Sequence, residues 1–463
     1  MISDRDSEGE DHQRNSPDFT VALQTVGCKL NQAETDFLAD QFLQAGYTIV
    51  DPDSPATVYI LNTCTVTHVA DRKCRHLLRS YHHRYPQALL VAIGCYAERA
   101  PEELARIEGV KLVVGQRDKA KLVELVNSRL LRSEAHPAKE GRPLAFPGRT
   151  RALVKVQEGC NHRCTYCIVP RVRGPARDVP EDEIVDQVKA RVEEGFQEVI
   201  LTGTQIGAYG GGLAKLLERL LNETGVKRLR LSSLEPQDLS PDLLRLWESG
   251  RICRHLHLPL QSGCDSVLRR MGRRYTTEEY WQKVNLAREF IPDLAITTDI
   301  MVGFPGETEE EFRQSYEFCR QIGFARIHVF PFSERPGTPA ARLPNKVPEP
   351  VKRQRRDEML KLAKLSAQEF RRRFLGRKLE VLWEGQKNGL WFGYTDNYLR
   401  VFTQSDHDLR NLLLPTRLTR ELDHGLAEGL VGEVKFVHPV NSKFKFCGVL
   451  NPVEGVWGDD GSH

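Results

Sequence analysis

The sequence lacks any apolar run long enough to cross a lipid bilayer, for which about 20 consecutive apolar residues are needed. Its first 18 residues are acidic and polar, and they lack the basic start and apolar core of a secretory signal. The sequence also has almost no net charge: the formal value is +3 over 463 residues. This value is too small to indicate a nucleic-acid binder by itself. These absences predict a cytoplasmic protein with no membrane association, whose thiols are kept reduced.

What is present is an ordinary globular composition together with grouped cysteines. A length of 463 residues suggests two to four domains, and 40% hydrophobic with 28% charged residues is typical of soluble globular proteins. There are 11 cysteines, several of them in a short motif or directly after predicted strands. In a reducing compartment, grouped cysteines are more often metal or redox ligands than disulfides.

Short apolar runs alternate with helical patterns through most of the chain. The first set of predicted strands is 21–27, 57–62, 88–94 and 111–115. This alternation predicts an α/β fold with a doubly wound parallel sheet. The second set of predicted strands is 152–157, 198–203, 228–234, 255–261, 295–303 and 326–332. Six βα units indicate a partial (βα)6 barrel rather than a closed eight-fold barrel.

The C-terminal part of the chain changes character. Residues 351–378 contain 11 Lys or Arg and 3 Asp or Glu, so the rest of the chain carries a net charge of −5. The segments after this basic helix have strand propensity with Gly and Asn turns, which predicts a small β-barrel. The predicted boundaries are a disordered tail (1–18), an N-terminal α/β domain (19–132), a linker (133–149), the partial barrel (150–350), the basic helix (351–375), the β-barrel (376–452) and a disordered tail (453–463).

Cys160, Cys164 and Cys167 form a C-x3-C-x2-C motif, a spacing that 11 cysteines in 463 residues seldom produce by chance. Three thiolates on one short loop can hold a 4Fe–4S cluster and leave one iron free for a substrate. The loop follows the first strand of the partial barrel, so it opens at the end where barrel active sites lie. The alternative is a structural zinc site with His162 as the fourth ligand.

This motif resembles that of the radical S-adenosylmethionine superfamily. In that family the free iron of the cluster binds S-adenosylmethionine, and reductive cleavage of the bound S-adenosylmethionine yields a 5′-deoxyadenosyl radical. The resemblance implies that three later segments, 201–207, 232–236 and 301–308, contact the methionyl amino group, the ribose and the adenosine. The implied cofactor-binding residues are Tyr166, Gly203, Thr204, Gln205, Ser233, Glu235, Gly303, Phe304 and Gly306. Taken alone, a Gly-rich strand end is more often a turn than a cofactor contact.

Cys28, Cys64 and Cys95 each follow a predicted strand of the first domain directly. In a parallel sheet these positions meet at the carboxyl edge, where ligands bind. The sequence therefore predicts a second set of three thiolates that can hold a cluster, and the alternative is three buried structural cysteines. The cysteines with no partner in either set are predicted to be core or surface thiols: Cys74, Cys253, Cys264, Cys319 and Cys447.

These segments resemble the N-terminal domain of the methylthiotransferase family, in which three such cysteines hold a second 4Fe–4S cluster. The similarity spans nearly the whole chain and implies that the C-terminal β-barrel is a TRAM-like RNA-binding domain. The segments GCKLNQAE around Cys28 and SERPGTPAARLP (333–344) are most similar to the MtaB-like branch, which acts on N6-threonylcarbamoyladenosine in tRNA. In place of the segment around Cys28, the branch that acts on isopentenyladenosine usually has a GCQMN-like segment, and the branch that acts on a ribosomal protein usually has GCPKN.

The resemblance implies a transferase with two 4Fe–4S clusters that uses two molecules of S-adenosylmethionine per turnover. One would methylate sulfur at the Cys28/Cys64/Cys95 cluster, and the other would provide the radical that removes hydrogen from C2 of the adenine. The implied partners are a tRNA anticodon stem-loop, whose target base must leave its stack, and a low-potential electron donor such as flavodoxin or ferredoxin. The alternatives are methylthiolation of isopentenyladenosine or of a ribosomal protein aspartate, and a non-catalytic metal-containing RNA-binding protein.

Basic and aromatic residues near the C-terminal domain are candidates for RNA contact. The candidates for phosphate binding are Arg371, Arg372, Arg373, Arg377 and Lys378. A solvated helix face explains this charge run nearly as well. The candidates for base stacking are Trp383, Trp391, Phe392 and Tyr394, although a place in the barrel core is favoured for them. Arg171, Arg173 and Arg177 are candidates for the carboxylate of the threonylcarbamoyl group, although a role as ordinary surface arginines is favoured for them.

Overall fold

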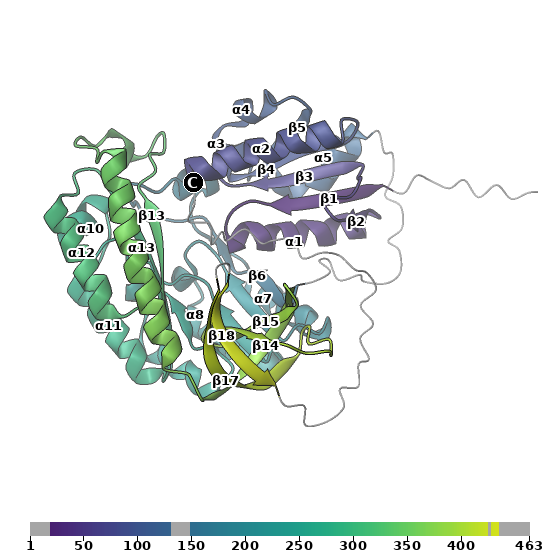
Figure 1. Cartoon of the computed structure of the whole chain (residues 1–463). Helices are drawn as coiled ribbons and strands as arrows, with labels where there is room; N and C mark the ends of the chain where they lie inside the picture. The colour runs from purple at the N-terminus through teal and green to yellow at the C-terminus, as the bar shows by residue number, and fades with distance from the viewer. Residues whose placement is uncertain (1–18, 131–148, 425–426, 435–463) are drawn as a thin grey trace, which may run out of the picture.

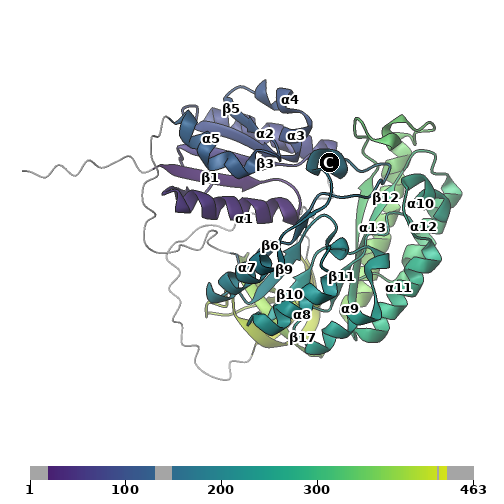
Figure 2. The ribbon, with the colours of Figure 1, turned by 180° about the vertical axis from the view of Figure 1, so that it is seen from behind.

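The structure, a computed structural model, describes residues 19–130, 149–424 and 427–434. Three units follow one another along the chain: a parallel-sheet domain, a partial barrel of parallel strands and a closed β-barrel (Figure 1). In Figures 1 and 2 the parallel-sheet domain lies at the top and the β-barrel at the bottom, next to the partial barrel. This architecture confirms the predicted α/β multidomain fold.

Five parallel strands form the sheet of the first domain, in the order β2-β1-β3-β4-β5. The strands are β1 (Thr20–Thr25), β2 (Thr48–Val50), β3 (Val58–Thr63), β4 (Leu89–Gly94) and β5 (Val110–Val114). The helices are α1 (Lys29–Gln44), α2 (His68–Arg84), α3 (Cys95–Arg99), α4 (Pro101–Ala105) and α5 (Leu122–Arg129). One apolar core lies under α1 and α5 and another under α2, α3 and α4, so the sheet is doubly wound and its central strand β3 is wholly buried.

Six parallel strands form the partial barrel of the second domain. They are β6 (Arg151–Lys155), β9 (Glu198–Thr202), β10 (Arg228–Leu231), β11 (His255–His257), β12 (Ala295–Val302) and β13 (Arg326–Pro331). The strands pair as β6-β9-β10 and β11-β12-β13, and isolated bridges join β10 to β11. No pairing within the described residues joins β6 to β13, and α1 of the first domain packs against β6 beside this opening.

Helices cover the outer face of these strands. They are α6 (Val169–Arg173), α7 (Glu181–Glu193), α8 (Leu213–Glu223), α9 (Pro241–Arg245), α10 (Asp265–Met271), α11 (Thr277–Phe290) and α12 (Glu309–Ile322). A short hairpin of β7 (Gln157–Glu158) and β8 (Arg177–Asp178) frames the loop that follows the first strand. The apolar residues of the strands and helices form one large core between the two layers, which leaves the other face of each strand directed into the barrel.

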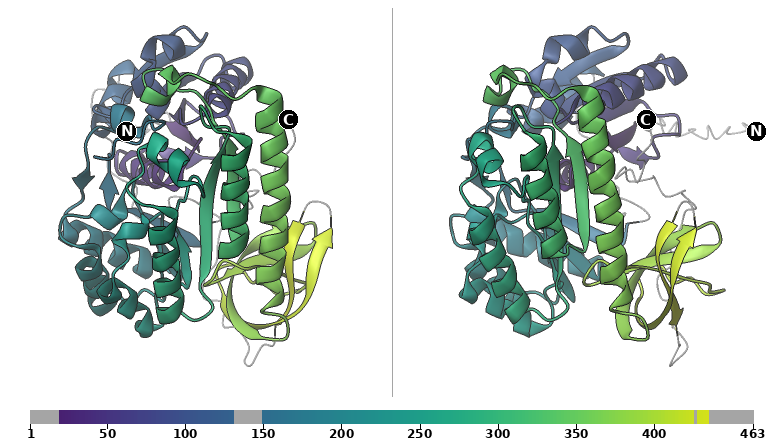
Figure 3. Two further views of the ribbon diagram at one scale, coloured as in Figure 1. Left: turned by 90° about the vertical axis from the view of Figure 1, so that its left-hand side faces the viewer. Right: turned by 60° about the vertical axis from the view of Figure 1, so that its left-hand side comes forward.

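The basic helix α13 (Glu349–Arg372) lies along β13 and leads into the C-terminal domain (Figure 3). The strands β14 (Lys378–Lys387), β15 (Leu390–Thr395), β16 (Arg400–Thr403), β17 (Leu413–His424) and β18 (Ala427–Val434) close into a barrel. Trp383 and Trp391 are 0% and 4% exposed inside it, which confirms that these two residues belong to its core. Phe392 and Tyr394 are half-buried on the same strand, β15.

Some predictions concern residues outside the described ranges. They are the tail 1–18, the linker 133–149 except its last residue, the end of the C-terminal domain beyond 434, Cys447 and the tail 453–463. The domain boundaries stay predictions. Among the helices of the described residues, none is both long and apolar enough to span a membrane.

Candidate functional site

The loop after β7 carries the first three cysteines. Cys160, Cys164 and Cys167 are half-buried between β7 and α6. The loop is tied to the barrel by a hydrogen bond from the N–H of Thr165 to the backbone oxygen of Met271 (2.9 Å). Burial raises the pKa of Cys167 to about 12 and also raises that of Cys160, so metal binding at this loop would release protons.

Polar side chains surround this loop. Arg273, which sequence reasoning missed, donates from Nη1 to Sγ of Cys164 (3.4 Å) and pairs with the carboxylate of Glu235. Sγ of Cys160 donates to Oε1 of Gln205 (3.5 Å). Glu235 and Gln205 are two of the predicted cofactor-binding residues, and the structure brings both of them next to the cysteine loop. The signal for Arg273 is not local, since it follows α10, more than 100 residues after the motif.

The second set of cysteines meets at the carboxyl edge of the first sheet. Cys28 is the N-cap residue of α1, Cys64 follows β3, and Cys95 is the first residue of α3 after β4. Cys64 and Cys95 are buried, and Cys28 is exposed. Burial is the main cause that raises the pKa of the Cys64 thiol, and the nearby thiols of Cys28 and Cys95 raise this pKa further. The topology therefore brings together three residues that lie more than 30 positions apart.

Gly27 allows this close approach. Its φ of +118° is one that L side chains rarely adopt, and a Cβ there would lie 2.7 Å from Cβ of Cys64 and 3.1 Å from its Sγ. We expect Gly27→Ala to displace Cys64 and to reduce the iron bound at this triad, because the new methyl group occupies the space of the Cys64 side chain. Iron and sulfide analysis of the reconstituted protein checks this, with Gly250→Ala as a control, since a Cβ at Gly250 meets nothing within 4 Å and its φ is also positive. An unchanged iron content would contradict the expectation.

The two sets of cysteines face each other across the contact between the first two domains. Cys95 packs on Ile168, which directly follows Cys167, and on Val172 of α6. The same contact contains a buried charge network centred on α1, in which Arg173 (3% exposed side chain) pairs with Glu34 at 2.7 Å. The network fixes the position of one cysteine set relative to the other.

The remaining partners of that network are Lys119, which lies 2.7 Å from Glu34, and Asn31, whose Oδ1 accepts from Arg173 at 2.6 Å. Arg173 is therefore held in a buried ion pair and is not the ordinary surface arginine that the sequence favours, while its role in binding a substrate carboxylate stays a prediction. Arg177 is paired with Glu158 (2.5 Å) on the β7–β8 hairpin. The guanidinium of Arg171 packs on Gly337, where a Cβ would lie 2.3 Å from its Nη1.

The spacing of the thiols distinguishes a cluster from a single zinc ion. A tetrahedral zinc site with Zn–S bonds of about 2.3 Å has sulfur atoms about 3.8 Å apart. Among the described side chains, neither cysteine set brings three ligand atoms within 4.8 Å of one another. His162, the alternative zinc ligand, instead has its Nε2 2.7 Å from Nε2 of Gln205. The thiols of neither set are therefore placed as the ligands of one tetrahedral zinc ion are.

Two more predicted cofactor-binding residues lie at the end of β9. The N–H and hydroxyl of Thr204 and the N–H of Gln205 all donate to Oε1 of Gln157, at 2.9 to 3.1 Å. A Cβ at Gly203 would lie 2.7 Å from the backbone oxygen of Gln157, so glycine allows the two strand ends to approach. Ser233 is half-buried after β10, where a bridge joins it to β11.

The segment after β12 has a packing role in this structure. Gly303 has a φ of +73°, and a Cβ there would lie 2.3 Å from Cγ of Lys352 on α13. Phe304 is 0% exposed and packs in the same apolar cluster as the half-buried ring of Tyr166. Gly306 also has a positive φ, of +77°, and a Cβ there would have no close neighbour. The packing of α13 accounts for Gly303, and contact of these residues with adenosine stays a prediction.

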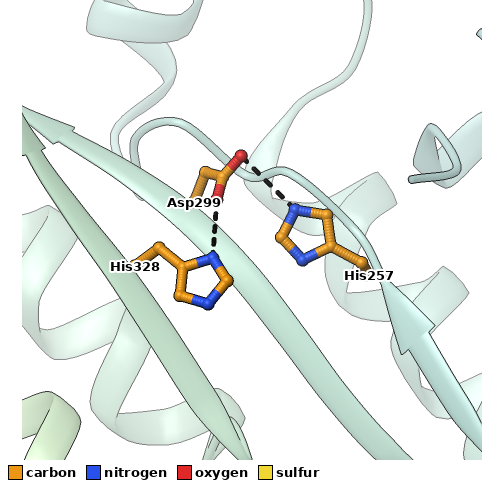
Figure 4. Close-up of side chains that lie close together, drawn as sticks. All are labelled: His257, Asp299 and His328. Atoms are coloured by element: carbon orange, nitrogen blue, oxygen red, sulfur yellow. Dashed lines mark hydrogen bonds and ion pairs between the residues drawn. The ribbon is translucent and has the colours of Figure 1, made fainter. Parts of the chain in front are cut away.

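Three polar side chains that sequence reasoning missed point toward one another inside the partial barrel (Figure 4). They are His257 from β11, Asp299 from β12 and His328 from β13, whose neighbours along each strand belong to the outer core. Nε2 of His257 lies 3.3 Å from Oδ2 of Asp299, and Nδ1 of His328 lies 3.1 Å from Oδ1. Although burial alone would raise the pKa of Asp299, the two imidazoles hold it well below its usual range.

The predicted phosphate-binding residues lie at the end of α13 and the start of β14: Arg371, Arg372, Arg373, Arg377 and Lys378. Arg372 pairs with Glu421 (2.9 Å), and Arg377 pairs with both carboxylate oxygens of Asp293 (2.9 and 2.5 Å). Arg373 and Lys378 are exposed, and the Arg373 guanidinium lies 5.3 Å from the centre of the Phe370 ring. A positively charged surface therefore exists here, but two of its members already have carboxylate partners.

Comparison with known proteins agrees with this geometry. Residues 154–319 match the model of the Radical SAM superfamily, and residues 20–115 match that of Uncharacterized protein family UPF0004. A Bacillus subtilis protein named threonylcarbamoyladenosine tRNA methylthiotransferase MtaB is 37% identical over 87% of this chain and 94% of its own length. The Aquifex aeolicus protein of the same name is 41% identical over 82% of this chain and 96% of its own length. A Syntrophotalea carbinolica tRNA-2-methylthio-N(6)-dimethylallyladenosine synthase is 34% identical over 86% of this chain and 96% of its own length.

Among solved structures, the radical S-adenosylmethionine methyltransferase TsrM of Kitasatospora setae has a similar fold. It superposes with a TM-score of 0.54 at 16% identity and covers 70% of this chain and 77% of its own. The whole-length relatives, together with two cysteine sets at facing edges of two α/β domains, establish the family. The chain belongs to the radical S-adenosylmethionine methylthiotransferases, transferases that use S-adenosylmethionine and 4Fe–4S clusters.

Proposed function

We propose that this chain methylthiolates C2 of N6-threonylcarbamoyladenosine next to the anticodon of tRNA, giving 2-methylthio-N6-threonylcarbamoyladenosine. The observation that carries the proposal is the packing of Cys95 on Ile168 and Val172, which brings the two cysteine sets face to face. Four relatives named as threonylcarbamoyladenosine tRNA methylthiotransferases, 34 to 41% identical over 82 to 90% of this chain, support this substrate.

In this proposal Cys160, Cys164 and Cys167 hold the cluster that binds S-adenosylmethionine, and the other three cysteines hold the second. When bound, these groups supply a carbon-centred radical and a methylated sulfur. The protein supplies position and charge: Arg273 donates to Sγ of Cys164, and the N–H of His162 donates to Sγ of Cys160. Such hydrogen bonds to the sulfurs also tune the potential of an iron–sulfur cluster.

The predicted contacts with S-adenosylmethionine are retained within this proposal. Tyr166, Gln205 and Glu235 are supported by their place at or beside the first cysteine loop. Glu235 is an acceptor that a ribose hydroxyl or an ammonium group can use, although Arg273 pairs with it here. Phe304 has the weakest support because its ring is wholly buried.

The proposed partners are a tRNA anticodon stem-loop and a low-potential electron donor of the flavodoxin or ferredoxin type. Reductive cleavage of S-adenosylmethionine requires an electron that no side chain of the protein supplies, which is why a donor is included. A substrate in mature tRNA also implies action in the cytoplasm.

Mass spectrometry of tRNA nucleosides tests the proposal. A strain that lacks this gene is compared with the same strain after the gene is restored. We expect the methylthio form of threonylcarbamoyladenosine to disappear and to return. If this nucleoside is unaffected and the methylthio form of isopentenyladenosine is lost, the substrate belongs to the other tRNA branch. If both are unaffected, ribosomal proteins become the place to look for the added mass.

Charge reversal at the end of α13 is expected to weaken tRNA binding. Arg373→Glu combined with Lys378→Glu removes two exposed cations, so the dissociation constant should rise and the slope of its logarithm with salt should fall by roughly 2. Filter binding at several salt concentrations measures both quantities. Arg245→Glu, on the exposed side of α9, is the matched control and should leave both unchanged. Equal affinities of the double variant and the control at low salt would refute this role.

A further inference from the structure

Lys29 is the side chain that connects the second cysteine set with the inside of the barrel. It is the first residue of α1 and follows Cys28 directly. Its side chain extends to the turn between β15 and β16, where its ammonium lies 5.6 Å from the centre of the Tyr398 ring. The same ring contacts His255 of β11, with centroids 4.7 Å apart. Lys29 therefore reaches from the edge of the first domain to the inner surface of the second.

This ammonium has no carboxylate partner among the residues that the structure describes. Other cations beside Tyr398 are paired: Arg151 with Glu384, and Arg230 with Glu198, both at 2.6 Å. Lys29 makes no ion pair or hydrogen bond from its side chain to any residue that the structure describes, and it is half-buried. A partly buried cation without a counter-ion is unfavourable, and it favours the binding of an anion.

The His257–Asp299–His328 cluster lies on the same inner surface. Thr297 links it to the region of Lys29, because its hydroxyl lies 2.9 Å from Nδ1 of His257 and 3.1 Å from Nε2 of His255. Burial lowers the pKa of His255 well below its usual value, and the positive charges of its neighbours lower it further. Those neighbours are Arg230, Lys29, His257 and His328. A chain of contacts through Tyr398, His255 and Thr297 thus links Lys29 to the cluster.

We propose that Lys29 binds the carboxylate of the substrate's N6 side chain and that the His257–Asp299–His328 cluster binds its hydroxyl group. This proposal rests on the proposed function, since the threonylcarbamoyl group is the N6 side chain that carries both groups. Cys28 is the N-cap of α1 and Lys29 its first residue, so one helix start presents both a ligand of the second cysteine set and the ammonium that reaches Tyr398. Asp299 can accept from the hydroxyl, and an ammonium–carboxylate pair supplies the charge recognition.

The test uses three anticodon stem-loops, which carry threonylcarbamoyladenosine, its methyl ester, or the glycylcarbamoyl analogue that lacks the hydroxyethyl group. Affinity is measured by fluorescence anisotropy, and kcat/KM is measured with the reconstituted enzyme. We expect Lys29→Met to weaken binding of the first stem-loop by about 10- to 100-fold and to leave that of the ester nearly unchanged. We expect Asp299→Asn to weaken binding of the first stem-loop more than that of the glycylcarbamoyl analogue. Lys121→Met, an exposed lysine in the same domain, is the control and should match the wild type.

An equal loss of affinity for the acid and the ester would overturn the role of Lys29. An equal loss for the threonyl and glycyl forms would overturn the role of the cluster. Each residue of the cluster offers one atom that could bind a metal ion, and these three atoms lie within 4.8 Å of one another. Bound zinc is therefore also measured, in a variant that lacks the six motif cysteines. Stoichiometric zinc that His328→Ala removes would assign the cluster to a metal ion and overturn its role in binding the hydroxyl. A wild-type enzyme that binds these stem-loops but modifies none of them would refute the proposed function itself, and this proposal with it.

Discussion

Alanine at Cys164 and alanine at Cys95 are both expected to abolish methylthiolation, but for different reasons. Each substitution removes one of three thiolates from one set, so each should cost about half of the iron and acid-labile sulfide of the reconstituted protein. Cys164→Ala should also stop the formation of 5′-deoxyadenosine, because its set is assigned to S-adenosylmethionine. Cys95→Ala should retain that cleavage and give no methylthiolated nucleoside.

The measurements are iron and sulfide per chain, 5′-deoxyadenosine by liquid chromatography and the modified nucleoside by mass spectrometry. Cys319→Ala is the matched control, because Cys319 is fully buried in the core of the partial barrel and belongs to neither cysteine set. This control should keep its iron and both activities. If Cys95→Ala kept all of its iron, the edge of the first sheet would hold no cluster. Loss of S-adenosylmethionine cleavage in Cys95→Ala with half of the iron retained would show that the two sites do not work separately.

The fold could be predicted where hydrophobic periodicity is strong. Strand β3 is a run of six buried residues, and the sequence places a strand at 57–62, one residue from its observed bounds. Strand β2 could not be found because it has three residues at the edge of the sheet and no buried position. Its pairing with β1 comes from the return of α1 to the sheet, which is a tertiary effect rather than a local preference.

The site could be predicted only to the extent that it is local or follows from topology. The first cysteine set is adjacent in sequence, and the second follows from strand ends that meet at one edge. The partners of these residues could not be predicted in this way. Arg273 reaches Cys164 from 109 positions away, and Arg173 reaches Glu34 from 139. Nothing local to Arg173 distinguishes a buried arginine from the surface arginine that the sequence suggests.

Arg173→Ala is expected to separate the two halves of the site. The substitution leaves the buried carboxylate of Glu34 with Lys119 as its remaining cation, and removal of one partner of a buried ion pair costs about 3 to 5 kcal/mol. Arg173 comes from α6 and Glu34 from α1, so the loss falls on the contact that holds the two cysteine sets together. S-adenosylmethionine cleavage should persist while methylthiolation falls strongly, and urea unfolding should begin at a lower concentration.

The matched control is Arg177→Ala, because Arg177 lies four residues from Arg173 and pairs with Glu158. The Arg177 side chain is 53% exposed, so loss of this ion pair should cost about 0 to 1 kcal/mol of unfolding free energy.

Unfolding in acid gives an independent measurement on the cluster-free protein. Burial alone would raise the pKa of Glu34, but the charges of Lys119 and Arg173 hold it well below its ordinary value of 4.5. The stability that this depressed pKa contributes is present above the unfolded value and is lost as the pH falls below it. The difference in unfolding free energy between the wild type and Arg173→Ala should therefore be full at pH 7 and should shrink in acid, beginning where Glu34 of the variant takes up a proton, because the unfolded states of the two proteins titrate alike. A difference that stays constant through this range would show that Arg173 stabilises the contact by packing rather than by its charge.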